Sequence, residues 1–259
     1  MKTLKVIKIG GNIINNEDSL LTFLKGFSSL KGPKILVHGG GKLASDLSNK
    51  MNIPVQLIDG RRVTNAETLD IITMVYAGKI NKNIVAKLQS FGCNSVGFTG
   101  ADGNTIIANK RSEAPVNYGF AGDVVKVDIS ILKVLINNNV ANIFSAISHD
   151  EKGQLLNTNA DTIASELAIA FSKDYRVELY YCFEKKGVLK RTDDENSLIK
   201  KINNQTYKEL KKSNIINDGM IPKLDNCFYA LDHNVSKVCI GNPTMLFDHH
   251  SNFTTIQKL

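Results

Sequence analysis

Short apolar runs alternate along the chain with longer stretches in which apolar residues recur every three or four positions. The first two runs span residues 4–9 and 34–37, and each leads through glycines into a helix-like stretch, near residues 18–30 and 43–51. Strands that are buried on both faces form continuous apolar runs, whereas amphipathic helices show the longer period. The alternation therefore predicts an α/β protein with a mainly parallel sheet and helices on its faces.

The rest of the chain continues this alternation. A hairpin is predicted at residues 55–64 with Asp59-Gly60 as its turn, and the capping-box sequence Thr64-Asn65-Ala66-Glu67 predicts a helix that runs to about Tyr76 or beyond. Further strands are predicted at 94–98, 105–108, 124–127, 141–147, 177–183 and 238–240, and further helices at 129–137, 161–171, 205–212 and 220–231. We expect a single domain over residues 1–259, with an N-terminal lobe of about 1–172 and a C-terminal lobe of about 173–259.

Composition places the chain among ordinary soluble enzymes. Hydrophobic residues make up 42% and charged residues 22% of the 259 residues. No apolar run approaches the roughly 20 residues of a membrane helix, and the first residues lack the apolar stretch of a signal peptide. We therefore expect a cytoplasmic protein with no membrane partner. The four cysteines form no C-x-x-C pair, so they predict packed thiols and no metal site.

The net charge of +7 leaves two interpretations open. A nucleic-acid binder would carry a clustered basic face, but the lysine pairs at 185–186, 200–201 and 211–212 are dispersed and lack interleaved aromatic residues. These pairs are typical of solvated surfaces, and we expect no nucleic-acid partner. Alternatively, the charge raises the local concentration of anionic substrates.

Two glycine turns, Gly10-Gly11 and Gly39-Gly40-Gly41, each connect a strand to a helix. Glycines at such turns let the backbone approach a phosphate closely, although many such turns only satisfy tight geometry. Neither turn matches a Walker A loop or a G-x-G-x-x-G fingerprint. Lys8 lies inside the apolar strand just before the first turn. A lysine there either has an anionic partner or extends to solvent.

Together these motifs resemble the amino-acid kinase family, and within it the enzymes that phosphorylate N-acylated glutamate. The resemblance covers nearly the whole chain in the family's order, and it rests on Lys8–Gly11, Val37–Gly41, Gly60–Thr64, Gly97–Gly103, Gly119–Val124, Asn157–Asp161 and Asp218–Lys223. It implies a three-layer αβα sandwich around a mainly parallel open sheet of about eight strands. It also implies that the N-terminal lobe holds the acylglutamate and the dimer contact, and that the C-terminal lobe holds ATP.

The resemblance also implies roles for individual residues. Lys8 and Lys223 would stabilise the transition state, and Asp161 would orient both lysines. The acylglutamate would be held by Gly40, Gly41, Arg62 and Asn157. The phosphates and the nucleotide would be held by Gly10, Gly11, Glu184, Gly187, Ile215, Ile216 and Asn217. Family members often carry Thr/Ser-Asp-x-x-Gly after the nucleotide strand, and here Glu184 takes the Asp position with Gly187 as the turn.

The chemistry of such a transfer suits these residue types. A carboxylate and a triphosphate repel each other, and lysines on both sides of the transferring phosphoryl group would offset that repulsion. The planar fork of Arg62 matches a carboxylate, and Asn157 can both donate to and accept from an amide. Asp161 has a second interpretation, as a first-turn aspartate favoured by the helix dipole. No cluster of carboxylates is evident, so Mg²⁺ would be held mainly by phosphates and water.

Several alternatives stay open on sequence alone. The expected reaction is the ATP-dependent phosphorylation of N-acetyl-L-glutamate in arginine biosynthesis, but N-succinyl-L-glutamate, aspartate, free glutamate or carbamate could replace that substrate. A non-catalytic amino-acid sensor on the same fold would have lost Lys8, Asp161 or Lys223, and all three are present. Arginine-inhibited family members carry an extra N-terminal helix that links dimers into hexamers. This chain has no room for it, so we expect a homodimer without that form of feedback.

Overall fold

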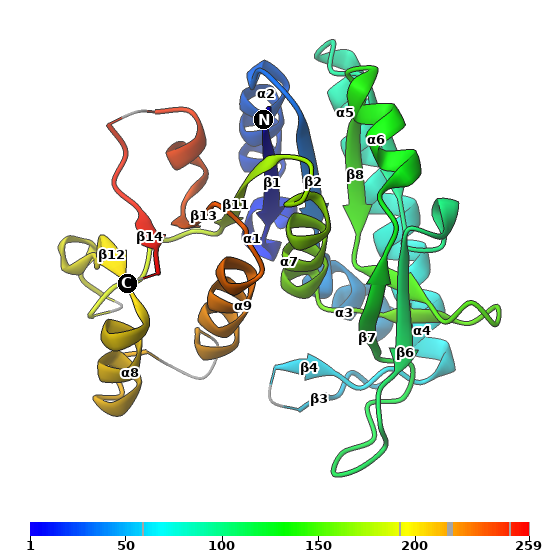
Figure 1. Ribbon diagram of the computed structural model, residues 1–259. Coiled ribbons are helices and arrows are strands. Elements are labelled where there is room, and N and C mark those ends of the chain that lie inside the picture. Colours follow the sequence, from blue (N-terminus) through cyan, green and yellow to red (C-terminus); the bar gives the residue numbers. More distant parts are fainter. Residues whose placement is uncertain (59, 192, 217–219, 249, 259) are drawn as a thin grey trace.

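The centre of the molecule is an eight-stranded sheet in the order β12-β14-β13-β11-β1-β2-β8-β5 (Figure 1). The computed structural model describes residues 1–58, 60–191, 193–216, 220–248 and 250–258. The strands of this sheet are β1 (Thr3–Ile9), β2 (Lys34–His38), β5 (Ser95–Phe98), β8 (Ala141–Ser145), β11 (Arg176–Cys182), β12 (Lys201–Ile202), β13 (Lys237–Gly241) and β14 (Thr254–Ile256). Only the β13–β14 pair is antiparallel within the described part of this sheet. The predicted mainly parallel sheet is therefore confirmed.

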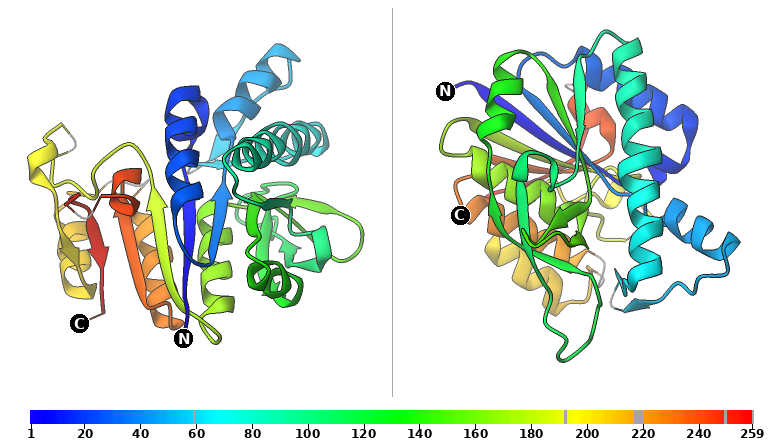
Figure 2. Two further views of the ribbon diagram at one scale, coloured as in Figure 1. Left: turned by 90° about the horizontal axis from the view of Figure 1, so that it is seen from above. Right: turned by 90° about the vertical axis from the view of Figure 1, so that its right-hand side faces the viewer.

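Helices cover both faces of this sheet (Figure 2). One face packs against α6 (Ser130–Asn137), α7 (Ala160–Phe171), α8 (Asn204–Lys212) and α9 (Ile221–Asp232). The other face packs against α1 (Gly11–Asn15), α2 (Glu17–Ser29), α3 (Gly41–Lys50), α4 (Ala66–Ile72), the π-helix η1 (Thr73–Ile80) and α5 (Asn81–Ser90). Short 3₁₀ turns are η2 (Asp102–Asn104), η3 (Glu195–Ser197) and η4 (Pro243–Leu246). The expected three-layer αβα sandwich is confirmed.

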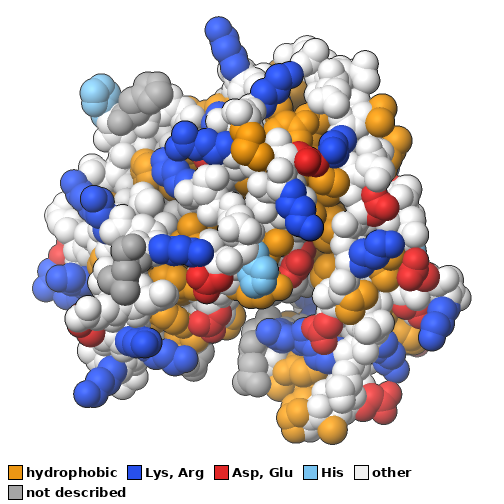
Figure 3. All heavy atoms as spheres, viewed as in Figure 1, with side chains coloured by type: hydrophobic (Ala, Val, Ile, Leu, Met, Phe, Trp, Pro, Cys, Tyr) orange, Lys and Arg blue, Asp and Glu red, His pale blue; other side chains and the backbone are white. Residues whose placement is uncertain are grey.

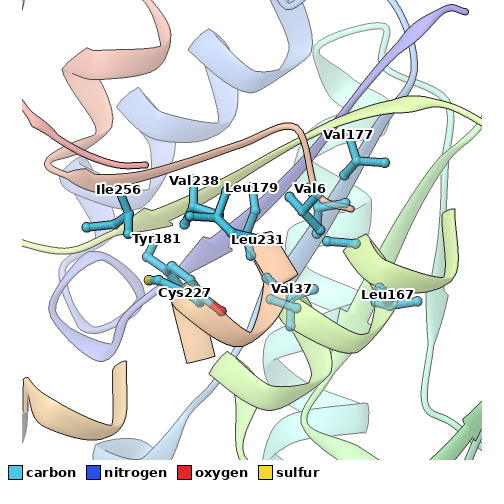
Figure 4. Close-up of a cluster of buried hydrophobic side chains, with 14 of the residues drawn as sticks. Val6, Val37, Leu167, Val177, Leu179, Tyr181, Cys227, Leu231, Val238 and Ile256 are labelled. Carbon is cyan, nitrogen blue, oxygen red and sulfur yellow. The ribbon is translucent and has the colours of Figure 1, made fainter. Parts of the chain in front are cut away.

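The period of two along β1 decides which side chains face which helices. Leu4 and Val6 are fully buried in the core beneath α7 and α9, whereas Ile7 and Ile9 are fully buried in the core beneath α1–α5. Figure 4 shows the first of these cores, with labelled side chains from the sheet, α7 and α9 gathered between the layers. Because successive strand residues point to opposite faces, Lys8 falls on the α7 and α9 side of the sheet. This register positions the candidate site.

A smaller sheet leaves the main one at the end of β8. It has the order β10-β9-β6-β7 and is formed by β6 (Ile106–Lys110), β7 (Gly122–Val127), β9 (Ile147–His149) and β10 (Leu155–Asn157). The single strand predicted at 141–147 therefore breaks at Ala146, where the chain passes from one sheet to the other. The predicted hairpin forms a two-stranded ribbon of β3 (Leu57–Ile58) and β4 (Arg61–Arg62), while Asp59 lies outside the described residues.

The predicted capping box is displaced by one residue. Asn65, and not Thr64, caps α4 through its side chain, which accepts a hydrogen bond from the Thr68 N–H at 2.9 Å. Thr64 is instead engaged outside the helix: its backbone bridges to Gly119, and its hydroxyl donates to the Arg62 carbonyl. The helical segment then continues through η1 and α5 to Ser90, in line with a helix predicted to run to Tyr76 or beyond. No helix in the described ranges is long and apolar enough to cross a membrane.

Candidate active site

Two lysines from different elements meet on one carboxylate at the carboxyl end of β1. The Asp161 Oδ1 atom lies 2.9 Å from Lys8 Nζ, and Asp161 Oδ2 lies 2.6 Å from Lys223 Nζ. Asp161 is placed by the first turn of α7, where the Asn159 side chain accepts a hydrogen bond from the Asp161 N–H. Lys223 lies in the first turn of α9, next to the helix-starting Pro222. The three side chains are 14–16% exposed, so Lys8 is paired and does not extend into bulk solvent.

Burial and mutual charge set the protonation of this cluster. Burial alone would raise the pKa of Asp161, but Lys8 and Lys223 hold that pKa well below its usual range. Burial lowers the pKa of Lys8, and Asp161 opposes this shift. Beneath the cluster, the Tyr181 hydroxyl donates to the Asp161 carbonyl at 3.1 Å, and the Tyr181 ring centroid lies 5.3 Å from Lys223 Nζ. With both lysines charged, the cluster carries one net positive charge that an anion can neutralise.

A cavity of about 310 Å³ opens beside this cluster. The predicted residues that line it are Lys8, Gly10, Gly11, Gly40, Gly41, Arg62, Asn157 and Asp161. Figure 3 shows a hollow on this face next to the β3–β4 hairpin, with Lys or Arg side chains at its edge. The structure thus brings together residues that are separated by up to 153 positions in the sequence (from 8 to 161).

Arg62 is fixed on one side and open on the other. Its Nη2 atom donates to the Gly41 carbonyl at 2.9 Å and to Ser45 Oγ at 2.7 Å. Its Nη1 atom is buried and has no hydrogen-bond partner among the described residues. A buried, unpaired guanidinium nitrogen is costly unless an anion binds it. Asn157 is oriented in a similar way, because its Nδ2 donates to Thr64 Oγ1 at 3.0 Å.

The second glycine turn is supported from behind by a buried histidine. The His38 Nδ1 lies 2.9 Å from the Gly39 carbonyl, and its Nε2 lies 3.0 Å from Asn81 Nδ2. Because a carbonyl can only accept and an amide nitrogen can only donate, Nδ1 carries the proton. Burial lowers the pKa of His38 to about 4, so the ring is neutral near pH 7. This neutral ring fixes the start of the turn.

Several cavity residues were not predicted from the sequence, and three of them carry polar groups that matter below. Tyr76 of η1 lines the cavity, and so do Arg111, which follows β6, and Asp123 of β7. The Arg111 Nε lies 3.1 Å from both carboxylate oxygens of Asp123. Tyr76 falls on an apolar helical pattern that is typical of core residues, and Arg111 falls in an irregular segment. Neither pattern carried a signal that could have placed these side chains at a site.

A second cavity, of about 580 Å³, lies at the end of β11. Its walls combine apolar and basic side chains, and it is lined by Phe183, Lys185, Gly187, Val188, Leu189, Lys190, Arg191, Asp193, Asn214, Ile215, Ile216 and Met220. Of the residues predicted for the nucleotide, it contains Gly187, Ile215 and Ile216. Glu184 is exposed and is not one of its lining residues, although its neighbours Phe183 and Lys185 both line the cavity. Asn217 lies outside the described residues.

The fold and the two cavities define an α/β protein that gathers cationic side chains at the carboxyl ends of parallel strands, where ligands bind in such sheets. The chain belongs to the amino acid kinase family, whose model matches residues 3–242. It is similar to the protein of Cytophaga hutchinsonii named acetylglutamate kinase, at 54% identity over 93% of this chain and 91% of that protein. The protein of the same name from Phocaeicola vulgatus is 48% identical over 92% of each chain.

Among solved structures, the crystal structure of smu.665 from Streptococcus mutans UA159 is similar to this chain. Its TM-score is 0.78 at 25% sequence identity, and the match covers 98% of both chains.

Within the described residues, no group of three or more His, Cys, Asp or Glu side chains could hold a metal ion.

Proposed function

We propose that this chain transfers the γ-phosphoryl group of ATP to the side-chain carboxylate of N-acetyl-L-glutamate, a step of arginine biosynthesis. The observation that carries the proposal is the pairing of Lys8 and Lys223 on Asp161, at 2.9 and 2.6 Å, beside a cavity that contains a buried, unpaired arginine nitrogen. Relatives that are about half identical over nearly the whole chain and share the name acetylglutamate kinase support it.

The cavity next to Lys8 suits an acylated glutamate. The Arg62 Nη1 atom can donate to the α-carboxylate, which would satisfy the one buried guanidinium nitrogen that lacks a partner in the described structure. Asn157, held by Thr64, can bind the acylamino group. The backbone of Gly40 and Gly41 leaves room for the substrate because neither residue carries a side chain.

The transfer breaks the bond between the γ-phosphorus and its bridging oxygen to ADP, and it forms a bond from the γ-phosphorus to a carboxylate oxygen. Negative charge shifts toward the leaving ADP as this happens. Lys8 would lie against the transferring phosphoryl group and Lys223 toward the leaving ADP, while ionised Asp161 keeps both ammonium groups in position. The carboxylate that attacks is already ionised near pH 7, so the reaction needs no general base.

We further propose that the second cavity holds ATP. Its apolar side chains suit the adenine ring, and Lys185, Lys190 and Arg191 suit the phosphates. Mg²⁺ would be held mainly by phosphates and water, since Asp161 is occupied by two lysines. The ion would neutralise phosphate charge. Removal of Mg²⁺ by a chelator should abolish turnover, and added Mg²⁺ should restore it.

A coupled ADP-release assay on purified protein tests the proposed reaction. We expect ATP turnover that depends on N-acetyl-L-glutamate, with little turnover on aspartate, free glutamate or carbamate. Lys8→Met and Lys223→Met should each lower kcat about 10²- to 10³-fold, as loss of a single transition-state donor does. Lys133→Met is the matched control, because Lys133 pairs with Asp174 in a more exposed ion pair and does not line either cavity. No turnover on any acylglutamate would refute the proposal.

The acyl group has a second candidate. Arg61, Arg62 and Arg111 all line the substrate cavity, which gives it more cations than an acetyl group requires. N-succinyl-L-glutamate, with one additional carboxylate, should therefore be assayed beside the acetyl substrate. A higher kcat/KM on the succinyl compound would reassign the acyl group and leave the rest of the proposal intact.

We also propose a cytosolic homodimer. For the dimer, light scattering should give twice 28.5 kDa, or 57.0 kDa. A mass of six subunits would contradict it. For the location, cell fractionation should place the protein with soluble enzymes.

A further inference from the structure

Tyr76 is an unusual side chain to find at the base of the substrate cavity. It comes from the π-helix η1, which lies between α4 and α5, and it is only 6% exposed. π-Helical segments are rare and often occur at functional sites, because they re-aim side chains that a regular helix would place elsewhere. Tyr76 lines the same cavity as Arg62 and Gly41.

The tyrosine ring is held against the second glycine turn. A Cβ atom added at Gly40 would lie 2.8 and 2.9 Å from two ring carbons of Tyr76 and 2.4 Å from Ile80 Cδ1. A Cβ atom added at Gly41 would lie 3.8 Å from the Tyr76 hydroxyl and 4.0 Å from Arg62 Nη2. The hydroxyl and the guanidinium therefore lie side by side at the turn, and tight packing around the ring keeps the hydroxyl in place.

Hydrogen-bond chemistry assigns the direction of the hydroxyl proton. The Arg62 guanidinium lies beside the Tyr76 hydroxyl at Gly41, and a guanidinium can only donate a hydrogen bond. Arg62 therefore cannot accept the Tyr76 proton, which stays available for another acceptor. Burial raises the pKa of Tyr76, partly opposed by the nearby Arg62 charge, so the phenol keeps its proton near pH 7.

We propose that Tyr76 is a specificity-determining residue whose hydroxyl donates to the α-carboxylate of the acylated amino acid, beside the donor from Arg62. The inference rests on the proposed function, since it names a further contact to the same substrate. One carboxylate oxygen accepts from Arg62 Nη1 and the other from Tyr76 Oη. This pair of donors selects an amino acid with a free α-carboxylate over a similar molecule without one.

The test replaces the hydroxyl alone. Tyr76→Phe keeps the ring and its packing, so we expect KM for the acylglutamate to rise about tenfold, as expected for loss of one hydrogen bond to a charged group. The values of kcat and of KM for ATP should stay within about twofold. Tyr180→Phe is the matched control: it removes a hydroxyl that donates to Glu178 at 2.7 Å and that does not line the cavity. We expect no change in KM for that variant.

An analogue separates this contact from a structural effect. N-acetyl-4-aminobutyrate has the same acylamino group and the same reacting carboxylate but lacks the α-carboxylate. Wild type and Tyr76→Phe should use it with equal kcat/KM, while isothermal calorimetry shows weaker binding of the acylglutamate to the variant. An unchanged KM for the acylglutamate, or an equal loss on both substrates, overturns the inference. If wild type neither binds nor turns over an acylglutamate, the proposed function falls and the inference falls with it.

Discussion

At the residue scale, the chemistry depends on charged groups that the fold brings together from distant parts of the chain. The local pattern around Lys8 left open whether it has an anionic partner, and the local pattern at Asp161 was equally compatible with a helix-dipole role. The structure places Asp161 in the first turn of α7 and also between both lysines, so the two interpretations coexist. Tyr76 could not be predicted, because its contacts depend on a π-helix that periodicity does not reveal.

Asp161→Asn should destabilise the protein near neutral pH. The substitution leaves two mostly buried ammonium groups without a counter-ion, and removal of one partner from such a cluster costs about 3 kcal/mol or more. The pKa of Asp161 is lower in the folded protein than the ordinary value of 3.8. Its stabilising contribution is therefore fully present above that value and is lost as the pH falls toward the folded pKa. Urea unfolding at about pH 7, 5 and 3.5 measures the difference in the free energy of unfolding.

We expect that difference to be constant between about pH 7 and 5 and to shrink at about 3.5. Asp174→Asn is the control, because Asp174 forms an ion pair with Lys133 in which both side chains are about 40% exposed. Such surface pairs contribute at most about 1 kcal/mol to the free energy of unfolding. If Asp161→Asn is as stable as Asp174→Asn at about pH 7, the two lysines do not depend on Asp161.

Arg62→Lys should weaken binding of the acylglutamate and leave ATP binding unchanged. A single ammonium group cannot bond to the Gly41 carbonyl, to Ser45 and to both oxygens of a carboxylate in the planar geometry of a guanidinium. Loss of one or two charge-assisted hydrogen bonds corresponds to a rise in KM of about 10- to 100-fold. Steady-state kinetics with each substrate varied in turn provide the measurement. The exposed neighbour Arg61 is the comparison, and Arg61→Lys should have a smaller effect. An unchanged KM for Arg62→Lys would show that charge alone, and not the fork, binds the substrate.

At the element scale, most strands and helices follow from the apolar periodicity, and the exceptions have physical causes. The run at 141–147 is buried throughout, in β8 as in β9, and its polar residues Asn142 and Ser145 are buried too, so the hydrophobic pattern gives no sign of the break at Ala146. The two-residue strand β12 depends on β14, a partner that lies far along the chain. The helix predicted to run to about Tyr76 or beyond ends at Ser90, and the pattern gave no sign that its middle section, η1, is a π-helix.

Two glycines in touching elements should respond in opposite ways to alanine. Gly40→Ala places a Cβ atom within 3 Å of both Ile80 and Tyr76, which are buried, so we expect a loss of about 1–3 kcal/mol in the free energy of unfolding. Gly78→Ala lies in η1 with no atom within 4 Å of its added Cβ, so we expect a gain of about 0.5–1 kcal/mol from the more restricted unfolded chain.

Urea unfolding of both variants, with wild type alongside, provides the measurement. Gly40→Ala should also raise KM for the acylglutamate, since Ile80 and Tyr76 must shift at the cavity wall, whereas Gly78→Ala should leave KM unchanged. A Gly40→Ala variant with wild-type stability and wild-type KM would mean that the turn tolerates a side chain and does not set the cavity shape.

At the scale of the whole molecule, the fold class was accessible from the sequence, and much of the site was not. Continuous apolar runs that end in glycine turns predicted the parallel sheet, and the order of the motifs indicated the family that the comparisons then showed. The nucleotide segment after Cys182 could only be carried over by resemblance, and Glu184 does not line the cavity there. The division into two lobes, the homodimer and the residue roles stay predictions, because they depend on ligands and partners that a single sequence does not encode locally.

The charge of the whole chain yields a final prediction about ionic strength. The net charge of the chain is +7. The substrate cavity itself has a local excess of two positive charges. It is lined by four cations, Lys8, Arg61, Arg62 and Arg111, and by two anions, Asp123 and Asp161. An increase in NaCl from about 0.05 to 0.3 M shortens the screening length from about 13 to 5–6 Å. We therefore expect KM to rise severalfold for the acylglutamate and for ATP. The value of kcat should stay nearly unchanged, because the mostly buried Lys8–Asp161–Lys223 cluster is screened less than the cavity mouth. Initial-rate measurements at several salt concentrations test this expectation.

A double variant separates the cavity charges from the overall charge. Lys211→Gln with Lys212→Gln removes two positive charges from the exposed end of α8, outside both cavities, and lowers the net charge from +7 to +5. If the cavity cations attract the substrates, this variant should keep wild-type KM values at low salt and the same salt dependence. If the overall charge attracts them, KM should already rise at low salt and its salt dependence should weaken. Values of KM that do not change with salt in either protein would contradict both explanations and would leave direct contacts, such as those of Arg62, as the basis of substrate affinity.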